Sequence, residues 1–234
     1  MQRLLPEPAS ELTDEEFREA YEFPADRPWV RASFVVSLDG ATVGPDGSSR
    51  SIASASDQRV FSMLRLRGDV VLVGAGTLRD EGYGPSRRPT AVVTRSLSLS
   101  PDLPLFADGT ASTPRTLIFS TDTAAHHAPA WLRECADIVP CGSPEVDLRV
   151  VIAELANRGF GRIHCEGGPT LLRDLAVAGL VDELAVSVSP LIVGAPSSHH
   201  LVDLPSGFVD PSRWRVTQVL EEDGTVFLLL RRPS

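Results

Sequence analysis

The chain has 234 residues, of which 42% are hydrophobic and 23% are charged, and its net charge is −9. These values are typical of a globular protein with one sizeable core or two small ones, and the acidic balance excludes a basic surface for nucleic acid. No apolar run approaches the roughly 20 residues of a membrane span and the N-terminus lacks the apolar region of a signal peptide, so we expect a cytoplasmic protein without membrane or nucleic-acid partners.

The N-terminal residues 1–26 are expected to form an arm, followed by a single domain over residues 27–234. In the arm, Thr13 and Glu16 have the spacing of a capping box, which predicts a short acidic helix over residues 13–22. An acidic helix of this kind is more often a solvated face than a binding arm, and both interpretations stay open.

The domain begins with a predicted strand followed by a predicted helix. Residues 28–40 combine an apolar run with a closing turn, which indicates a buried strand. Residues 54–68 show a helical pattern that starts near Ser54 or Ser56 and is stopped by Gly68.

Strands and helices then alternate along the chain. Four further apolar runs predict strands over residues 69–77, 89–96, 115–121 and 137–140. Helices are predicted over residues 129–136 and 146–159. Because each strand is a solid apolar run, the pattern favours an α/β fold with a mainly parallel central sheet that is flanked by helices. Residues 183–194 and the hairpin 213–232 add strands without intervening helices, which predicts an antiparallel C-terminal edge.

The stretch "IHCEGGPTLLRDL" places a carboxylate where a strand meets a helix. Glu166 ends the predicted strand, Gly167 and Gly168 form a turn, and Pro169 is suited to the first helical position. The free N–H groups of that helix start favour an anion such as a pyrophosphate. The alternative, that these residues only make a tight strand-to-helix connection, stays open because short glycine motifs are weak signals.

A second glycine loop lies at the end of the run over residues 69–77 and contains Gly74, Gly76 and Thr77. Neither loop matches GxGxxG, and no carboxylate stands about 20 residues beyond the glycines to bind a ribose hydroxyl. That position instead offers Thr94, Arg95 and Ser96, a set suited to a 2′-phosphate, which favours NADPH over NADH. Arg95 alone is more commonly a solvated surface charge.

Four segments together resemble a known family: "VSLDGATVGPDG", "LRGDVVLVGAGTLRDEGYGP", "IHCEGGPTLLRDLAVAGLVDEL" and "SPLIVG". In order and spacing they are similar to the reductase domain of the riboflavin pathway, whose fold is similar to dihydrofolate reductase. The resemblance runs from about Arg27 to Arg231. It implies NADPH-dependent reduction of 5-amino-6-(5-phosphoribosylamino)uracil to its ribitylamino form, and it implies a homodimer.

The resemblance also implies site residues, position by position. The resemblance implies cofactor contacts from Ser37, Ser51, Gly76, Thr77, Glu81, Thr94, Gly167, Gly168, Pro169, Thr170 and Leu171, and the second glycine loop and the strand end described above add Gly74, Arg95 and Ser96. The resemblance implies substrate contacts from Ser49, Arg65, Arg88 and Glu166, and Ser33 and Asp39 are further candidates. Glu81 and Glu166 are the candidate catalytic proton donors, because no histidine, tyrosine or lysine is evidently placed for this role.

Several of these assignments have structural alternatives. Arg65 could simply face solvent or the last carbonyls of its helix, and Asp39 could hold a turn. Arg87 could take the place of Arg88. Three cysteines without CxxC spacing predict buried thiols, and the pairs His126–His127 and His199–His200 lack a third ligand, so no metal is expected.

The chain also departs from the family pattern. Many bacterial members carry a lysine where this chain has Ser33, and they contain a deaminase domain with zinc ligands that is not found here. "DEGYGP" stands where many members have "DNP". The expected activity is therefore the reductive step alone, with two alternatives: a related reductase of another heterocycle or carbonyl compound, and a non-catalytic nucleotide-binding protein.

Overall fold

The computed structural model describes residues 1–9, 11–24, 26–107, 114–194 and 213–233. In this part of the chain the strands are β1 (Gln2–Leu5), β2 (Trp29–Ser37), β3 (Val70–Gly74), β4 (Thr90–Val93), β5 (Thr116–Ser120), β6 (Ala136–Pro140), β7 (Arg162–Gly167), β8 (Glu183–Ser189), β9 (Arg215–Glu222) and β10 (Thr225–Arg231). The helices are α1 (Asp14–Glu19), α2 (Ala55–Arg67), α3 (Ala75–Glu81), α4 (Asp122–His126), α5 (Ala130–Cys135), α6 (Leu148–Asn157) and α7 (Pro169–Val177). His199 and His200 lie outside the described residues.

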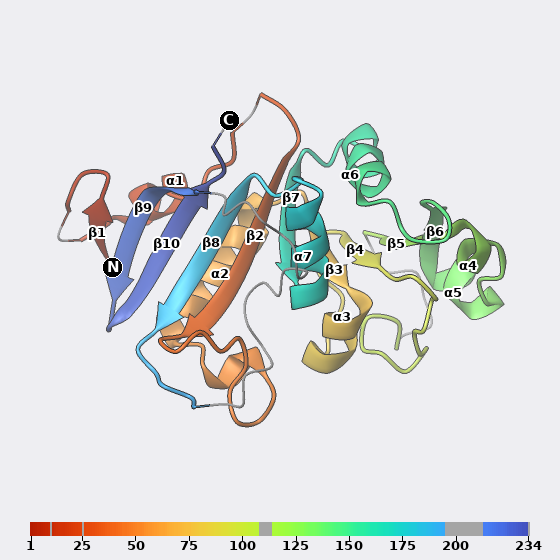
Figure 1. Ribbon diagram of the computed structural model, residues 1–234, viewed down its shortest axis with the longest axis horizontal. Coiled ribbons are helices and arrows are strands. Elements are labelled where there is room, and N and C mark those ends of the chain that lie inside the picture. Colours follow the sequence, from red (N-terminus) through yellow and green to blue (C-terminus); the bar gives the residue numbers. More distant parts are fainter. Residues whose placement is uncertain (10, 25, 108–113, 195–212, 234) are drawn as a thin grey trace.

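These ten described strands form one sheet in the order β1-β9-β10-β8-β2-β7-β3-β4-β5-β6 (Figure 1). The seven strands from β8 to β6 in this order are parallel to one another. The strands β10, β9 and β1 add an antiparallel edge next to β8. The predicted α/β fold, with a mainly parallel sheet and an antiparallel C-terminal edge, is confirmed.

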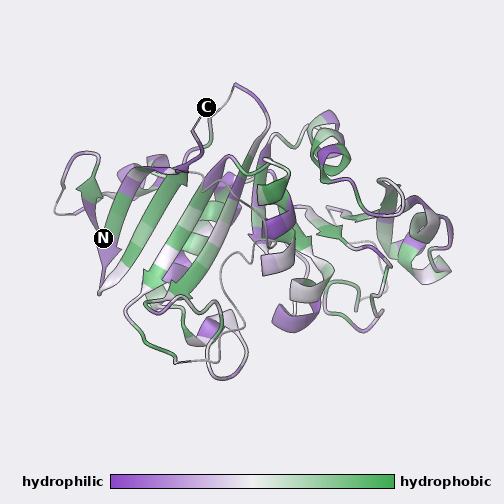
Figure 2. Ribbon diagram, in the orientation of Figure 1, coloured by the Kyte–Doolittle hydropathy of each residue, from purple (hydrophilic) through white to green (hydrophobic). Residues whose placement is uncertain are grey.

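Helices cover both faces of the sheet, and Figure 1 shows α7 in front of it and α2 behind it. On the α7 side, leucines of α6 and α7 pack with β2 and β7 residues such as Ala32 and Cys165. On the other side, Val60 and Leu64 of α2 pack with Phe227 of β10. Figure 2 shows mostly hydrophobic strands at the centre of the sheet and a hydrophilic end of α3. Side chains therefore alternate between two cores along each central strand.

Local signals account for several helix boundaries. The Ser54 hydroxyl accepts a hydrogen bond from the backbone N–H of Asp57, so α2 begins where its capping residue predicts. Gly159 and Gly179 have φ angles of 86° and 67° just past α6 and α7, a conformation that glycine adopts without steric cost. The capping box of Thr13 and Glu16 is also present, so the predicted helix of the N-terminal segment is confirmed.

The N-terminal segment is attached to the sheet at two points. β1, which the sequence did not predict, pairs with β9 at the edge of the sheet. Phe17 and Tyr21 are buried in the core beneath α1. The guanidinium of Arg31 donates to the backbone oxygens of Tyr21 and Glu22, at 2.7 and 2.9 Å, and it pairs with Glu183. A fully buried arginine therefore connects this segment to the central strands.

Candidate active site

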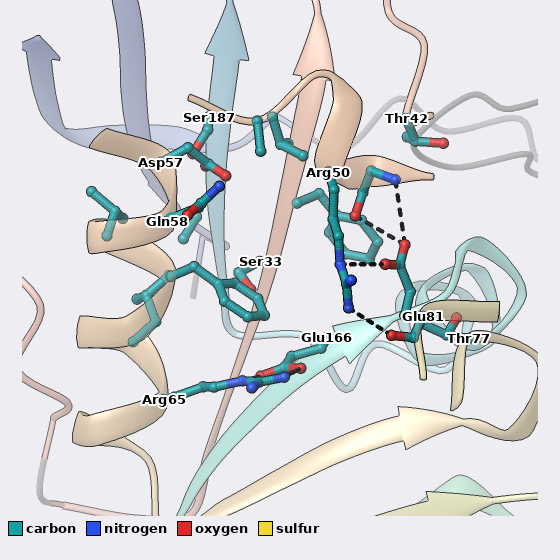
Figure 3. Close-up of a pocket in the computed structure, with 18 of the residues that line it drawn as sticks. Ser33, Thr42, Arg50, Asp57, Gln58, Arg65, Thr77, Glu81, Glu166 and Ser187 are labelled. Atoms are coloured by element: carbon teal, nitrogen blue, oxygen red, sulfur yellow. Dashed lines mark hydrogen bonds and ion pairs between the residues drawn. The ribbon is translucent and has the colours of Figure 1, made fainter. Parts of the chain in front are cut away.

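A cavity of about 620 Å³ opens between α2 and the face of the sheet formed by β2, β7 and β8 (Figure 3). Cavities of a few hundred to about 1,000 Å³ are typical of small-molecule sites. The expected site residues that line it are Ser33, Ser49, Arg65, Thr77, Glu81, Glu166, Gly168 and Pro169. These residues come from five different segments of the chain, so the fold brings together what the sequence keeps apart.

Glu166 faces this cavity because side chains alternate between the two faces of the sheet along β7. Ile163 and Cys165 point into the core below α6 and α7, so His164 and Glu166 point toward α2. His164 is completely buried, and its Nε2 lies 2.7 Å from the hydroxyl of Ser33 on β2. Burial lowers the pKa of His164 to about 4, so this imidazole is neutral at pH 7. Its Nδ1 lies 3.5 Å from Oε1 of Glu166.

Arg65, Tyr83 and Glu166 form a hydrogen-bonded cluster at one end of the cavity. Nε and Nη2 of Arg65 donate to the two carboxylate oxygens of Glu166, each at 2.6 Å, in the bidentate arrangement that is strong for a guanidinium. The hydroxyl of Tyr83 donates to Oε2 at 2.6 Å. Burial and the negative charge of Glu166 raise the pKa of Tyr83 well above its usual value, so this residue is a neutral hydrogen-bond donor.

A second polar cluster surrounds Glu81, at the end of α3. The hydroxyl of Ser49 donates to the Glu81 carboxylate at 2.9 Å, and Nε of Arg50 lies 3.8 Å from its other oxygen. Arg50 also donates to the backbone oxygen of Glu81 at 2.8 Å. Figure 3 shows this cluster on the opposite wall of the cavity from Arg65. The two expected catalytic glutamates therefore lie in separate clusters.

Asp57 places a third carboxylate on the cavity wall, about two helical turns before Arg65 on α2. Only 9% of this residue is exposed, and the hydroxyl of Ser187 on β8 hydrogen-bonds its carboxylate. Burial raises the pKa of Asp57, and the bond from Ser187 offsets this rise only in part. Figure 3 shows Asp57, Gln58 and Ser187 together, away from Glu166.

The two predicted glycine loops lie side by side, because β3 and β7 are neighbours in the sheet. A Cβ added to Gly74 would lie 3.6 Å from the backbone oxygen of Gly167, and one added to Gly168 would lie 2.5 Å from Oγ1 of Thr77. Gly167 has a φ angle of 87° and packs against the ring of Phe34. A side chain at Gly167 would therefore collide with Phe34, and one at Gly168 would require the Thr77 side chain to move.

The strand beside β3 is β4, and its end carries the set expected to select NADPH. Thr94 is buried and its N–H donates to the backbone oxygen of Phe119 at 3.0 Å. The Arg95 side chain is 70% exposed and lies 3.2 Å from a carboxylate oxygen of Glu145. Ser96 is exposed. All three residues stand at the same edge of the sheet as the glycine loops.

A model of the RibD C-terminal domain matches residues 28–226 of this chain. The chain belongs to this family. A curated relative, the 2,5-diamino-6-ribosylamino-4(3H)-pyrimidinone 5′-phosphate reductase of Methanothermobacter thermautotrophicus, is 33% identical over 186 residues, covering 76% of this chain and 84% of the relative. The family membership predicted from four motifs is confirmed, and the relative's name agrees with a reductase of the riboflavin pathway.

Solved structures resemble this RibD C-terminal domain in fold. A pyrimidine reductase-like protein from Corynebacterium diphtheriae has a TM-score of 0.76 and 20% identity, over 88% of this chain and 92% of the other. Dihydrofolate reductase from Enterococcus faecalis, complexed with NADP(H) and RAB-propyl, has a TM-score of 0.53 and 10% identity, over 89% and 98% of the two chains. The predicted similarity to dihydrofolate reductase is confirmed for the fold.

Some expected site residues of this RibD C-terminal domain lie outside the cavity. Ser37 and Asp39 hold a turn, in which Asp39 accepts hydrogen bonds from the Ser37 hydroxyl at 2.6 Å and the N–H of Gly194 at 2.9 Å. These bonds lower the pKa of Asp39 to about 2. The exposed Ser51 hydroxyl, at the end of a short 3-10 helix (Ser49–Ser51), donates to Asp46 at 2.6 Å. For Asp39, the structure thus favours the turn among the two interpretations left open.

Three further expected residues also lie away from the cavity wall. Arg88 donates to the backbone oxygen of Leu66 at 2.7 Å, beside Asp69, at the opposite edge of the sheet from Glu166. Thr170 and Leu171 belong to the first turn of α7, where Leu171 is buried in the core and Thr170 is exposed. Their predicted contacts with ligands stay predictions.

The structure also adds cavity residues that the sequence interpretation missed. The sequence interpretation found no histidine, tyrosine or lysine evidently placed to donate a proton, whereas the structure brings Tyr83 and His164 into contact with Glu166. Asp57 was missed although it has a usable signal: Asp57, Phe61 and Arg65 follow one another at spacings of four residues on α2 and share one helix face.

Other features of the described residues concern cysteines, metals and membranes. The three predicted buried thiols are confirmed, since Cys135, Cys141 and Cys165 are all buried and free. Within the described ranges, no cluster of three or more His, Cys, Asp or Glu side chains could hold a metal ion. No described helix has the length and apolar character that crossing a bilayer requires.

Proposed function

We propose that this chain is the NADPH-dependent reductase of the riboflavin pathway, which converts the ribosylamino group of a 6-(5-phosphoribosylamino)pyrimidine into a ribitylamino group. The observation that carries the proposal is the position of the two adjoining glycine loops directly beside a polar cavity of about 620 Å³. Gly168, Pro169 and Thr77 belong to both features. A cofactor on the loops and a small substrate in the cavity would therefore be in contact.

The residues at this edge fit a nicotinamide dinucleotide. No heavy atom lies within 4 Å of a Cβ added to Gly76, so the first turn of α3 is open to a ligand. The nine residues of α7 direct free N–H groups and a positive helix dipole toward the same place. Arg95 offers its exposed guanidinium to a 2′-phosphate if it exchanges its contact with Glu145.

Bound NADPH would supply the hydride that adds to C1′ of the ring-opened sugar imine, while the imine nitrogen gains a proton and NADP⁺ and the amine remain. The protein must hold that carbon and exclude water around it. Arg65 and Tyr83 are fixed on Glu166 at the cavity wall, where they present a cation and a hydroxyl. Glu81 and Glu166 remain the proposed carboxylates for proton transfer, and the Tyr83 hydroxyl joins them.

The direct test follows the absorbance of NADPH after addition of the ribosylaminopyrimidine phosphate, with dihydropterin as a comparison substrate. We expect oxidation of one NADPH per ribityl product, which is identified by mass spectrometry. Oxidation with dihydropterin alone would overturn the proposed substrate class and retain a reductase. Absence of oxidation together with absence of NADPH binding would overturn the reductase itself.

The cofactor site has its own test. In Gly168→Val the new side chain would collide with Thr77, so we expect NADPH binding to be lost while the circular dichroism spectrum is retained. Gly161→Val is the matched control, since a Cβ at this residue near the start of β7 meets no heavy atom within 4 Å. Unchanged NADPH affinity in Gly168→Val would place the dinucleotide elsewhere.

We also propose that NADPH binds more tightly than NADH because of Arg95, by about 1 to 3 kcal/mol, the range of a charge-assisted contact. Calorimetry with both cofactors should show this difference in the wild-type protein and its loss in Arg95→Ala. Equal affinities in the wild-type protein would contradict the role of residues 94–96.

A homodimer is proposed on the basis of one exposed apolar patch. Leu38 and Ile192 are 65% and 76% exposed, and the N–H of Leu38 donates to the backbone oxygen of Leu191. Burial of such side chains between two copies would remove them from water. We expect Leu38→Arg to be monomeric in sedimentation experiments and Val177→Arg, which alters another exposed apolar side chain, to remain dimeric. A cytoplasmic location also stays a proposal.

A further inference from the structure

We propose that Asp57 recognises the two-donor edge of a 2-aminopyrimidin-4-one, and that the chain therefore selects the 2,5-diaminopyrimidinone phosphate over the 5-aminouracil phosphate. The inference rests on the proposed function and names which of the two pyrimidines the same site takes. They differ at ring position 2, where one carries an amino group and the other a carbonyl oxygen. The preference must therefore come from a group that distinguishes a donor from an acceptor.

The cavity places polar groups at two ends of one helix face. Asp57 and Arg65 both line it from α2, with Phe61 between them. Eight residues along a helix correspond to roughly 12 Å, about the length of a heterocycle with its attached sugar. Figure 3 shows Asp57 beside Ser187 at one end and Arg65 beside Glu166 at the other. An elongated substrate could thus contact both ends at once.

The Glu166 end offers few free acceptor sites for a ring. A carboxylate has about four lone-pair positions for hydrogen bonds. Arg65 uses two of them and Tyr83 a third, all at 2.6 Å. The Nδ1 atom of His164 lies 3.5 Å from Oε1 on the remaining side. A heterocycle would have to displace one of these groups to bond Glu166.

Asp57 stands in a different situation. It accepts from the hydroxyl of Ser187, and it forms no ion pair with any basic side chain in the described part of the chain. Since Asp57 is only 9% exposed, its carboxylate has lost most of its water. A buried carboxylate in this state is stabilised by a ligand that brings two N–H donors.

The ring chemistry supplies this pair of donors. In a 2-aminopyrimidin-4-one, N3–H and the 2-amino group point in the same direction and match the two oxygens of a carboxylate. In the uracil, the carbonyl oxygen at position 2 would face a carboxylate oxygen, and two acceptors repel each other. A buried mismatch of this kind is a strong basis for rejecting the wrong substrate. A carboxylate at this position therefore favours the amino ring.

The experiment compares kcat/KM for the two phosphates in the wild-type protein, in Asp57→Asn and in Asp57→Ala. We expect the wild-type protein to prefer the diaminopyrimidinone by roughly ten- to a hundredfold. Asparagine keeps the shape but offers one donor and one acceptor, which complements the uracil edge, so the preference should reverse in Asp57→Asn. The ratio of the two kcat/KM values should fall to near one in Asp57→Ala. Asp80→Asn, which removes an exposed carboxylate at the rim of the same cavity, should leave the ratio unchanged.

A binding measurement separates recognition from chemistry and from folding. Calorimetry with the free bases 2,5,6-triaminopyrimidin-4-one and 5,6-diaminouracil should show the same preference and the same reversal, in variants whose thermal midpoint and NADPH affinity are unchanged. Equal turnover of both phosphates with no effect of Asp57→Asn would overturn the inference and leave the proposed function intact. A uracil preference that persists in Asp57→Asn would mean that Asp57 is protonated, and it would overturn the inference too. No turnover of either phosphate would overturn the proposed function and, with it, this inference.

Discussion

Two arginine–glutamate pairs lie on the same side of the sheet and differ in what surrounds them. Arg31 of β2 pairs with Glu183 of β8, and both side chains are completely buried. Arg65 of α2 pairs with Glu166 of β7, where the arginine side chain is 37% exposed and the glutamate 1% exposed. The same two residue types therefore form a closed pair in the core and an open pair on the wall of the cavity.

The difference lies in how the remaining hydrogen-bond groups are used. The other nitrogens of Arg31 donate to backbone oxygens of the N-terminal segment, and Glu183 also accepts from Arg231 at 2.8 Å. Burial lowers the pKa of Arg31 despite its partner. The pKa of Arg65 is raised, because the bonds and the charge of Glu166 outweigh the effect of burial. We propose that the closed pair maintains the fold, whereas the open pair on the cavity wall serves a ligand.

The largest expected effect tests the closed pair. Glu183→Gln leaves the buried charge of Arg31 without a partner, and breaking such a pair typically costs about 3 to 5 kcal/mol. Urea unfolding followed by circular dichroism should show this loss, while kcat/KM per folded protein stays unchanged. If the variant is as stable as the wild-type protein, the assignment of this pair to the fold is wrong.

A pH experiment tests whether water reaches the buried side of the open pair, where His164 contacts Glu166. The pKa of His164 is lowered to about 4 in the folded protein, whereas an unfolded histidine titrates at about 6.5. Between these values only the unfolded chain binds the proton, so the free energy of unfolding should fall as the pH falls from 6.5 to 4, by about 3 kcal/mol.

The matched variant for this experiment is His164→Asn, which should remove most of the slope of the unfolding free energy against pH. His126→Asn replaces an exposed histidine and should leave it unchanged. Equal slopes in all three proteins would show that water reaches the inner side of the pair.

The next effect in size concerns the open pair itself. Glu166→Gln replaces one acceptor oxygen by a donor and releases Arg65 and Tyr83, so we expect a loss of about 1.5 to 3 kcal/mol in transition-state binding, roughly ten- to 150-fold in kcat/KM. NADPH affinity should not change. Intact kcat/KM with lowered thermal stability would make the open pair structural, like the closed one.

The fold could be predicted largely from local signals. Solid apolar strands that alternate with capped helices predicted the parallel sheet, and Ser54 and Gly68 marked the ends of α2. β1 was missed because its four residues have no apolar alternation, and α3 because Gly74 in its capping position makes no side-chain cap. Both elements depend on contacts with distant strands that a local pattern does not contain.

The site could be predicted only in part. The two short glycine motifs marked the ends of β3 and β7. These strands are neighbours in the sheet, so the two motifs lie together. Arg65 and Glu166 were both expected to contact the substrate, but their pairing across 101 positions follows from the tertiary fold. The same holds for Tyr83, because nothing in "DEGYGP" shows that its hydroxyl reaches a carboxylate at the end of β7.

The smallest predicted effect distinguishes two roles for this tyrosine in the open pair. Tyr83→Phe removes one hydrogen bond to Glu166 and leaves both bonds from Arg65, so we expect a loss of about 1 kcal/mol, roughly fivefold in kcat/KM. Because burial and the charge of Glu166 raise the pKa of Tyr83, its phenol should stay protonated beyond pH 10 and add no alkaline limb to the wild-type profile.

The double variant Tyr83→Phe, Glu166→Gln then shows whether the hydroxyl acts through the carboxylate. If Tyr83 only orients Glu166, the double variant should match Glu166→Gln, since the hydroxyl has nothing left to orient. If Tyr83 delivers the proton to the substrate nitrogen, the two losses should add, and kcat should fall while KM stays constant. Neither substitution touches Arg31 or Glu183, so urea unfolding of the double variant should be close to that of Glu166→Gln. Non-additive kinetics without a change in unfolding is the result that separates the open pair from the closed one.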